Sequence, residues 1–288
     1  MMLNRIIESA ELSAGRFTFC LSSRFRGSPG GGKFGNKTGQ SLEFVEHREY
    51  QPGDDIRHLD WSAVARSDKL AIKLFKEEIT PHVDIFLDLS SSMSAFDVKF
   101  QALAALSAIL KRTASNSGFS YDNWLVKDLC RKIEPNTLPV ELWPAFSADY
   151  NDDSGKTICY RFPKVKRGGV RILISDLFWH IEPMSVLNRM ADGSASVIIV
   201  QLVAKSDILP DIYGNMRVID SESGDALELV CDEQILSEYT ANFERHRQYW
   251  KKCCSKVGAI FNFVVAEDIL DNYIPDELIR NEVLMVKG

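Results

Sequence analysis

The sequence VDIFLDLSSS, residues 83–92, decides the fold. Its first seven residues are mostly apolar and partly β-branched, which is typical of a strand covered on both faces of a sheet, and three serines follow. From residue 97 onward, apolar side chains recur at helical spacing, at Phe100, Leu103, Leu106, Ile109 and Leu110. A buried strand, a polar loop and an amphipathic helix in this order predict one βα unit of a parallel sheet.

The same pattern continues toward the C-terminus. Further buried strands are predicted at 170–178, 196–204 and 259–266, and helices at 183–192, 233–256 and 267–285. The segments 119–126 and 129–134 look like a strand pair, and a hairpin is predicted around the turn Ser223-Gly224. Strands that alternate with helices predict a doubly wound, mostly parallel, Rossmann-type α/β domain over residues 81–288.

An N-terminal extension precedes this domain. Residues 1–22 predict an amphipathic helix, and the sequence GSPGGGKFGNKTG at 27–39 predicts a flexible connector. Residues 40–80 form a dense segment with a Pro-Gly-Asp turn, a short helix at 60–66 and a strand at 70–78. We therefore expect three parts: a helix with a Gly-rich linker (1–39), a segment packed on the main domain (40–80) and the α/β domain (81–288).

Composition excludes several classes of protein. Lys and Arg total 34 against 40 Asp and Glu, and the net charge of −6 disfavours a nucleic-acid partner. No apolar run approaches the ~18 residues that a membrane span needs, and the first residues carry acids where a signal peptide is apolar. We expect a cytoplasmic protein without a transmembrane segment. The six cysteines include no CxxC pair, which predicts reduced thiols rather than disulfides or a cysteine zinc framework.

Two acids are predicted at the carboxyl edge of the sheet, where α/β proteins bind ligands. Asp88 ends the first buried strand and is followed by Ser90 and Ser92, and Asp176 ends the strand at 170–175. Oxygen-only ligands of this kind suit Mg²⁺ or Mn²⁺. Because these few ligands leave an octahedral position open, a carboxylate of another protein could complete the shell. The pattern thus indicates a metal-bridged recognition surface.

Other interpretations of these residues stay open. Asp88 and Ser92 could cap the following helix or bond the loop backbone without any metal. A phosphatase of the haloacid-dehalogenase type would use Asp88 as nucleophile, but its second acid is replaced here by Ser90. The run from Gly27 to Lys33 has phosphate-loop spacing but continues with Phe34, and we interpret it as a linker. No histidine, including His180, forms a recognisable pair with a nucleophile, so no catalytic residue is assigned.

The strand-end DLSSS and the later ISDLF resemble the metal-ion-dependent adhesion site (MIDAS) of von Willebrand factor A domains. Asp88, Ser90 and Ser92 match its DxSxS element, and Asp176 corresponds to its later aspartate. The resemblance implies a von Willebrand factor A-like fold and a bound divalent cation. The family also uses a threonine from an intervening loop, for which Thr137 and Thr157 are the candidates by order.

The preceding segment resembles the signature of the domain-of-unknown-function 58 (DUF 58) family, in which R-x-Y-x-P-G-D-D-x-R-x-x-D-W-x-x-x-A-R precedes an A-type domain. The matching residues are Arg48, Tyr50, Pro52, Gly53, Asp54, Asp55, Arg57, Asp60, Trp61, Ala65 and Arg66. We expect the acids and arginines to form a charge network that anchors this segment, with Trp61 in a hydrophobic pocket, and partner binding by these residues is the alternative. The resemblance implies an adaptor or assembly factor that acts with a MoxR-type AAA+ ATPase.

Together these features predict a non-enzymatic protein-interaction module. Its cofactor would be Mg²⁺ or Mn²⁺, held by Asp88, Ser90, Ser92 and Asp176. Its partners would be a MoxR-type ATPase and a client protein that offers an acidic side chain to the metal. A metal-independent scaffold with a degenerate MIDAS is the alternative, and a metal-dependent phosphohydrolase is a further one.

Overall fold

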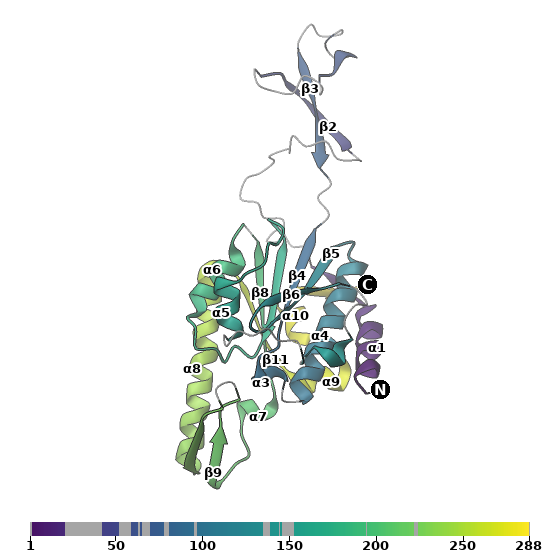
Figure 1. Ribbon diagram of the computed structural model, residues 1–288. Coiled ribbons are helices and arrows are strands. Elements are labelled where there is room, and N and C mark those ends of the chain that lie inside the picture. The colour runs from purple at the N-terminus through teal and green to yellow at the C-terminus, as the bar shows by residue number, and fades with distance from the viewer. Residues whose placement is uncertain are drawn as a thin grey trace. The chain divides into compact units, whose positions relative to one another are not determined.

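A computed structural model describes residues 2–20, 42–51, 59–62, 64, 70–77, 81–94, 97–134, 139–143, 145, 153–193, 195–221 and 224–287. The chain divides into two compact units. One contains residues 1–27 and 81–288, and the other contains residues 28–80. Within the described residues of the first unit, the architecture is mixed α/β, with a six-stranded and mostly parallel sheet flanked by helices (Figure 1).

The central sheet has the strand order β11-β8-β7-β4-β5-β6. Its strands are β4 (His82–Asp88), β5 (Ser120–Val126), β6 (Cys130–Ile133), β7 (Val170–Ser175), β8 (Ser196–Val203) and β11 (Ile260–Val265). All neighbouring pairs are parallel except β5 with β6. Each strand agrees with a segment predicted from the sequence. Every residue of β4 and β7 is buried, as continuous apolar runs require when helices cover both faces of a parallel sheet.

Two hydrophobic clusters lie on opposite faces of this sheet. One joins β4 and its neighbours to α1 (Met2–Ala14), α4 (Asp97–Asn116), α9 (Ala266–Asn272) and α10 (Asp276–Arg280). The other packs α5 (Ser154–Tyr160), α6 (Pro183–Ala191) and α8 (Glu233–Val257). Figure 1 shows the two groups of helices on either side of the strands. This arrangement buries both faces of the central strands.

The N-terminal helix belongs to this unit. The amphipathic pattern at 1–22 becomes α1, but the helix ends at Ala14, and β1 (Phe17–Phe19) then pairs antiparallel with β12 (Leu284–Val286). The Asn116 amide donates to the Ala14 carbonyl oxygen over 3.0 Å, and Phe19 stacks on Phe119. The strand partner at the far end of the chain explains why Phe17 and Phe19 leave the helix, because pairing buries both rings.

The C-terminal segment differs from the single helix predicted at 267–285. It forms α9, α10 and β12, with a break at residues 273–275. Tyr273 adopts a left-handed backbone conformation with φ 55°, and Pro275 follows it. Proline lacks the N–H that would continue the hydrogen-bond ladder of α9, so the helix ends before it.

The first unit also contains two short helices that were not predicted from the sequence. The short helix α3 (Ser91–Ser94) lies directly after β4, and α7 (Lys205–Ile208) follows β8. The hairpin of β9 (Gly214–Ile219) and β10 (Ala226–Cys231) forms where a turn at residues 223–224 was expected. Asp232 caps the N-terminus of α8 by accepting from the Ile235 N–H over 2.9 Å, and Gly258 ends that helix with φ 72°.

The second unit contains the antiparallel pair β2 (Leu42–Glu49) and β3 (Ala71–Glu77). Asp60 is buried, and its carboxylate accepts from the Ser62 N–H over 3.0 Å at the start of a helical turn. Trp61 is 69% exposed, so among the described residues of this unit it does not fill the predicted hydrophobic pocket. The proposed charge network of Asp54, Asp55, Arg57 and Arg66 lies outside the described residues.

Candidate metal centre

Asp88 ends the central strand β4 and is completely buried. Its Oδ1 accepts a hydrogen bond from the Ser90 N–H over 2.8 Å. Its Oδ2 accepts from the Ser175 hydroxyl over 2.6 Å and from the Trp179 indole N–H over 3.2 Å. Ser175 ends the neighbouring strand β7, so the two strands are linked at their carboxyl ends through this carboxylate.

Asp176 follows β7 directly and is also completely buried. One of its oxygens, Oδ2, lies 3.0 Å from the ammonium of Lys99, a residue of α4 that is only 1% exposed. Lys99 also lies 3.2 Å from Asp207 Oδ2 on α7. The other oxygen of Asp176 accepts from the Phe178 N–H over 3.2 Å. The buried ammonium of Lys99 therefore already lies beside Asp176, the second acid of the predicted site. The sequence pattern did not suggest this pair.

The strand order explains why Asp88 and Asp176 meet. From β4 the chain proceeds to β5 and β6 on one side, whereas β7, β8 and β11 lie on the other side. β4 and β7 are neighbours at this reversal, and the carboxyl ends of strands at such a point form the usual ligand crevice of an α/β sheet. The two acids are close enough for their charges to repel each other.

This environment changes the titration of Asp88. Burial, and then repulsion from Asp176, raise its pKa from 3.8 to about 6. Hydrogen bonds from Ser154, Ser175 and the Ser90 N–H act in the opposite direction, because they stabilise the charged form. A bound cation at this position would relieve the repulsion that burial intensifies.

The two predicted serines lie beside Asp88 at the start of α3. Ser90 is 4% exposed, and its hydroxyl oxygen lies 3.1 Å from that of the half-buried Ser92. Ser90 also accepts at its carbonyl oxygen from the Ser94 hydroxyl over 2.9 Å, which holds the turn. The structure thus places Asp88, Ser90 and Ser92 in one short stretch from the end of β4 into α3, near Asp176.

The structure adds Ser154, which sequence reasoning did not single out. The Ser154 hydroxyl donates to the Val126 carbonyl oxygen over 3.3 Å, and its proximity to Asp88 lowers the pKa of that carboxyl. Thr157 is completely buried on the same helix, and its hydroxyl has no hydrogen-bond partner among the described residues. Thr137 lies outside the described residues. The sequence signal for Ser154 was the stretch NDDSG, in which an aspartate caps a helix that begins at the serine.

The tryptophan that donates a hydrogen bond to Asp88 is itself tightly packed. Trp179 packs edge to face on Trp250 with ring centroids 6.2 Å apart. A side chain at Gly155 would place its Cβ 2.8 Å from the Trp179 ring and 2.6 Å from Ile181 Cγ2, so only glycine permits this approach of α5. Between Asp176 and Trp179 the backbone turns through Leu177, whose φ is 64°, an uncommon conformation for a residue with a branched side chain.

The chemical types of the donor atoms suit a hard divalent cation. Carboxylate and hydroxyl oxygens come from Asp88, Asp176, Ser90 and Ser92, with Ser154 as a fifth donor, and such oxygens are the ligands of Mg²⁺ and Mn²⁺. The His246 imidazole lies 3.0 Å from the Leu177 carbonyl oxygen and interacts electrostatically with Asp176, so one imidazole is also near the cluster. The closely placed Lys99 ammonium is the feature that competes with a metal for Asp176.

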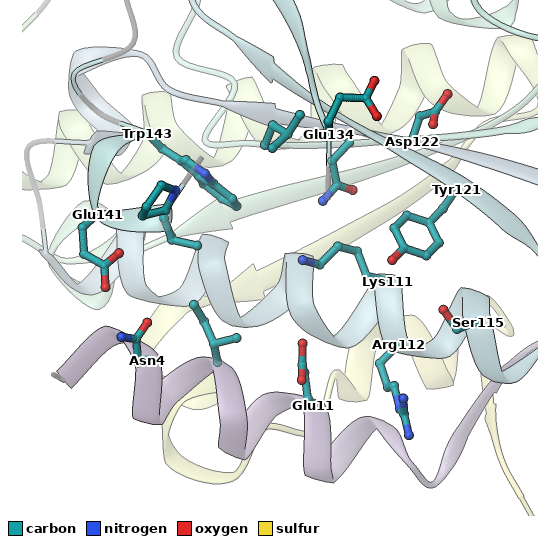
Figure 2. A pocket seen from close by; sticks show the side chains of 15 residues that line it. Asn4, Glu11, Lys111, Arg112, Ser115, Tyr121, Asp122, Glu134, Glu141 and Trp143 are labelled. Atoms are coloured by element: carbon teal, nitrogen blue, oxygen red, sulfur yellow. The ribbon is translucent and has the colours of Figure 1, made fainter. Parts of the chain in front are cut away.

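A cavity lies elsewhere in the first unit. It has a volume of about 810 Å³ and is bounded by α1, α4, the β5–β6 pair and residues 139–143. Figure 2 shows charged side chains from several of these elements around it, including Glu11, Lys111, Arg112 and Asp122. None of the predicted site residues lines this cavity, so the buried cluster of Asp88 and Asp176 is separate from it.

Comparisons with known proteins give a family and relatives without an established function. The family described as "Protein of unknown function DUF58" matches residues 46–137. An uncharacterized protein of Mycobacterium bovis, Mb1516, is 26% identical over 268 residues, which cover 85% of this chain and 82% of the relative. The uncharacterized protein Rv1480 of Mycobacterium tuberculosis gives the same values.

Two solved structures are distantly similar. The protein BatB of Bacteroides thetaiotaomicron has a TM-score of 0.37 and 13% identity, covering 70% of this chain and 98% of its own. An aerotolerance-related membrane protein of Bacteroides fragilis has a TM-score of 0.35 and 14% identity, covering 69% of this chain and 99% of its own. Scores at this level carry no conclusion about fold or function. Among the described residues, no helix has the length and apolarity that crossing a membrane requires.

Proposed function

We propose that this protein is a non-enzymatic interaction module that binds Mg²⁺ or Mn²⁺ through Asp88, Ser90, Ser92 and Asp176, in the manner of a MIDAS in a von Willebrand factor A-like domain. The observation that carries the proposal is the meeting of Asp88 and Asp176 at the strand reversal between β4 and β7, with serine hydroxyls beside them. When bound, the cation would offer an open coordination position to a carboxylate of a partner protein.

The surface near this edge supports a protein partner. The β9–β10 hairpin follows β8 through α7, the helix whose Asp207 contacts Lys99. Apolar side chains on this hairpin are exposed at Val218, Ile219, Leu227 and Val230. Exposed apolar patches of this kind commonly mark protein-interaction sites.

The partners themselves are proposed from the resemblance stated above. The described signature residues Tyr50, Asp60 and Trp61 lie on the second unit, and the family implied by them suggests a role as an adaptor or assembly factor with a MoxR-type AAA+ ATPase. The client would be a protein that presents an acidic side chain, and the site of action would be the cytoplasm.

A non-enzymatic role is supported by the surroundings of Asp88. A phosphohydrolase of the type considered above needs an acid two residues after the nucleophile to transfer a proton. Here that residue is Ser90, whose hydroxyl contacts the Ser92 hydroxyl.

A second candidate function is a metal-independent scaffold with a degenerate site. The contact of Lys99 with Asp176 favours it, because a buried ammonium compensates a buried carboxylate without any metal. In that case the acidic cluster would only fix the ends of β4 and β7, and partner binding would be insensitive to chelators.

Calorimetric titration of Mn²⁺ into the chelator-treated full chain tests the proposal. We expect one bound Mn²⁺ per chain, at least about ten-fold weaker binding by Asp88→Asn, and unchanged binding by Asp268→Asn, a matched change of an acid that is 65% exposed. Equal binding by wild type and Asp88→Asn would contradict the proposal. An absence of binding by wild-type protein would favour the scaffold.

A further inference from the structure

A second cluster of metal-ligand side chains lies near the opposite end of β4. His82 and Asp84 are two residues apart on this strand, so they face the same side of the sheet. The register pairs Asp84 with Asp122 of β5 and His82 with Ser120. One ligand atom from each of His82, Asp84 and Asp122 lies within 4.8 Å of the others. The parallel register of β4 with β5 brings these three side chains together, and it could not be inferred from the sequence.

The cluster contains buried atoms that lack partners. The His82 side chain is 5% exposed and that of Asp84 is 1% exposed. His82 Nε2 and Asp84 Oδ2 have no hydrogen-bond partner among the described residues. A buried polar atom that stays unsatisfied costs about 1–3 kcal/mol. A ligand placed between the imidazole and the two carboxylates would satisfy the His82 nitrogen.

The distances between the ligand atoms agree with an ion that is coordinated tetrahedrally, such as Zn²⁺. His82 Nε2 lies 3.4 Å from Asp84 Oδ1 and 3.5 Å from Asp122 Oδ2. These contacts are longer than good N–H···O hydrogen bonds. Zinc holds nitrogen and carboxylate ligands at about 2.0–2.1 Å in a tetrahedron, which places the ligand atoms about 3.3–3.4 Å apart.

Neighbouring groups orient each ligand. His82 Nδ1 lies 2.8 Å from the Ser120 hydroxyl oxygen, and Ser120 in turn contacts the Pro81 carbonyl oxygen over 3.5 Å. If Nδ1 carries the proton and donates to Ser120, the Nε2 lone pair faces the carboxylates, which is the tautomer that metal binding requires. The Trp124 indole donates to Asp84 Oδ1 over 2.9 Å.

Charged groups around the cluster support an alternative interpretation, in which the cluster binds no metal. Lys132 lies 2.9 Å from Asp122 Oδ1, and Arg171 interacts electrostatically with Asp84. Lys166 lies 3.5 Å from His82 Nδ1, a contact that suits the opposite tautomer. With that tautomer, His82 would donate weakly to the two acids, and the cluster would be a purely structural charge network.

We infer that His82, Asp84 and Asp122 form a zinc-class metal site, separate from the Asp88 cluster. The three side chains supply one imidazole nitrogen and two carboxylates, and water would complete the shell. Asp122 lines the cavity described above and is the partly exposed member of the group, so one ligand of the site is accessible to solvent (Figure 2). The inference does not depend on the proposed function.

Titration of Co²⁺ into the chelator-treated full chain, followed by displacement with Zn²⁺, tests this site. Four-coordinate Co²⁺ at an imidazole and two carboxylates absorbs in the visible range without the near-ultraviolet band of thiolate ligation. We expect one such equivalent in wild type and at least about ten-fold weaker binding in Asp122→Asn and His82→Gln. Asp122 is 23% exposed, so its variant is the one expected to fold normally.

Two matched controls separate the interpretations. Glu134→Gln changes the other acid that contacts Lys132, and it should leave Co²⁺ binding unchanged. Asp88→Asn removes a ligand of the proposed Mg²⁺ or Mn²⁺ site but should keep the visible band of four-coordinate Co²⁺, and so distinguishes failure of this inference from failure of that site. The inference is overturned if wild type gives no visible band, if a thiolate band appears instead, or if Asp122→Asn binds like wild type.

Discussion

The Lys99 ammonium lies 3.0 Å from Asp176 Oδ2, with both side chains almost completely buried. This pair places a fixed positive charge at the edge of the sheet where a divalent cation is proposed. The same acid also raises the pKa of the neighbouring Asp88. Competition between the lysine and a metal for Asp176 therefore decides how this site behaves.

Replacing this lysine separates the two candidate functions. Lys99→Met leaves Asp176 buried without its cation, and breaking a buried pair costs about 3–5 kcal/mol. We expect the metal-free variant to unfold at lower denaturant concentration and to gain more stability from Mn²⁺ than wild type gains. Chemical denaturation with and without Mn²⁺ measures both effects.

Lys205→Met is the matched control, because Lys205 forms an exposed ion pair with Asp268 over 3.2 Å. Its unfolding midpoint should change little, as exposed ion pairs contribute little to stability. If Mn²⁺ fails to stabilise Lys99→Met beyond wild type, competition between Lys99 and a metal for Asp176 does not control metal binding.

The titration of Asp88 predicts a pH-dependent stability in metal-free protein. The folded protein keeps the proton up to about pH 6, whereas the unfolded chain releases it near pH 4. The folded state thus binds more protons in this window, and the free energy of unfolding falls as pH rises from about 4 to about 6, by at most about 3 kcal/mol. Asp88→Asn should lose this component of the urea-denaturation profile, and an unchanged profile would contradict the assignment.

The packing around Gly155 predicts a coupling to Asp88. A Cβ at residue 155 would overlap Ile181 and the Trp179 ring, and overpacking of this kind costs about 1–3 kcal/mol. Because Trp179 donates to Asp88, Gly155→Ala should also weaken Mn²⁺ binding. Tryptophan fluorescence and Mn²⁺ titration check the two effects.

Gly224→Ala serves as the comparison for Gly155→Ala. Gly224 has φ 77°, and an added Cβ there meets no atom within 4 Å, so backbone strain is its main effect. We expect lower stability with unchanged Mn²⁺ affinity. Equal loss of affinity in both variants would show that stability, rather than the position of Trp179, controls the site.

We predict that the thiols of Cys130 and Cys254 are unreactive in the folded protein. Burial, reinforced by the neighbouring Cys253, raises the pKa of the Cys254 thiol to about 12, and burial does the same for Cys130. Because the thiolate is the nucleophile, both residues should resist alkylation at pH 8 until the chain unfolds. Mass spectrometry after iodoacetamide treatment in native buffer and in urea measures this, and rapid native labelling of Cys254 would be inconsistent with it.

Some features of the site followed from the sequence because they are local. Asp88, Ser90 and Ser92 lie within five residues of one another, so a strand followed by LSSS already fixes their proximity. The strands β4, β7, β8 and β11 were predictable because each is a continuous apolar run, and α4 was predictable from its helical spacing. The edge acid Asp176 followed from its place at the end of a buried strand.

Other features depended on contacts between distant segments, which no local pattern encodes. The pairing of β1 with β12 joins the two ends of the chain, and it redirected residues that continued a helical pattern. Lys99 looked like an ordinary polar position on an amphipathic helix, and only the packing of α4 against the edge of the sheet placed its ammonium on Asp176. Likewise, the register of β4 with β5 brought Asp122 to His82 and Asp84.

The amino-acid sequence by itself determined the alternation of strands and helices and the acids at the strand ends, because hydrophobic periodicity and loop chemistry are short-range properties. The tertiary structure alone decided which charges are buried together. Burial and charge pairing depend on which elements become neighbours, and that choice is made by the whole core.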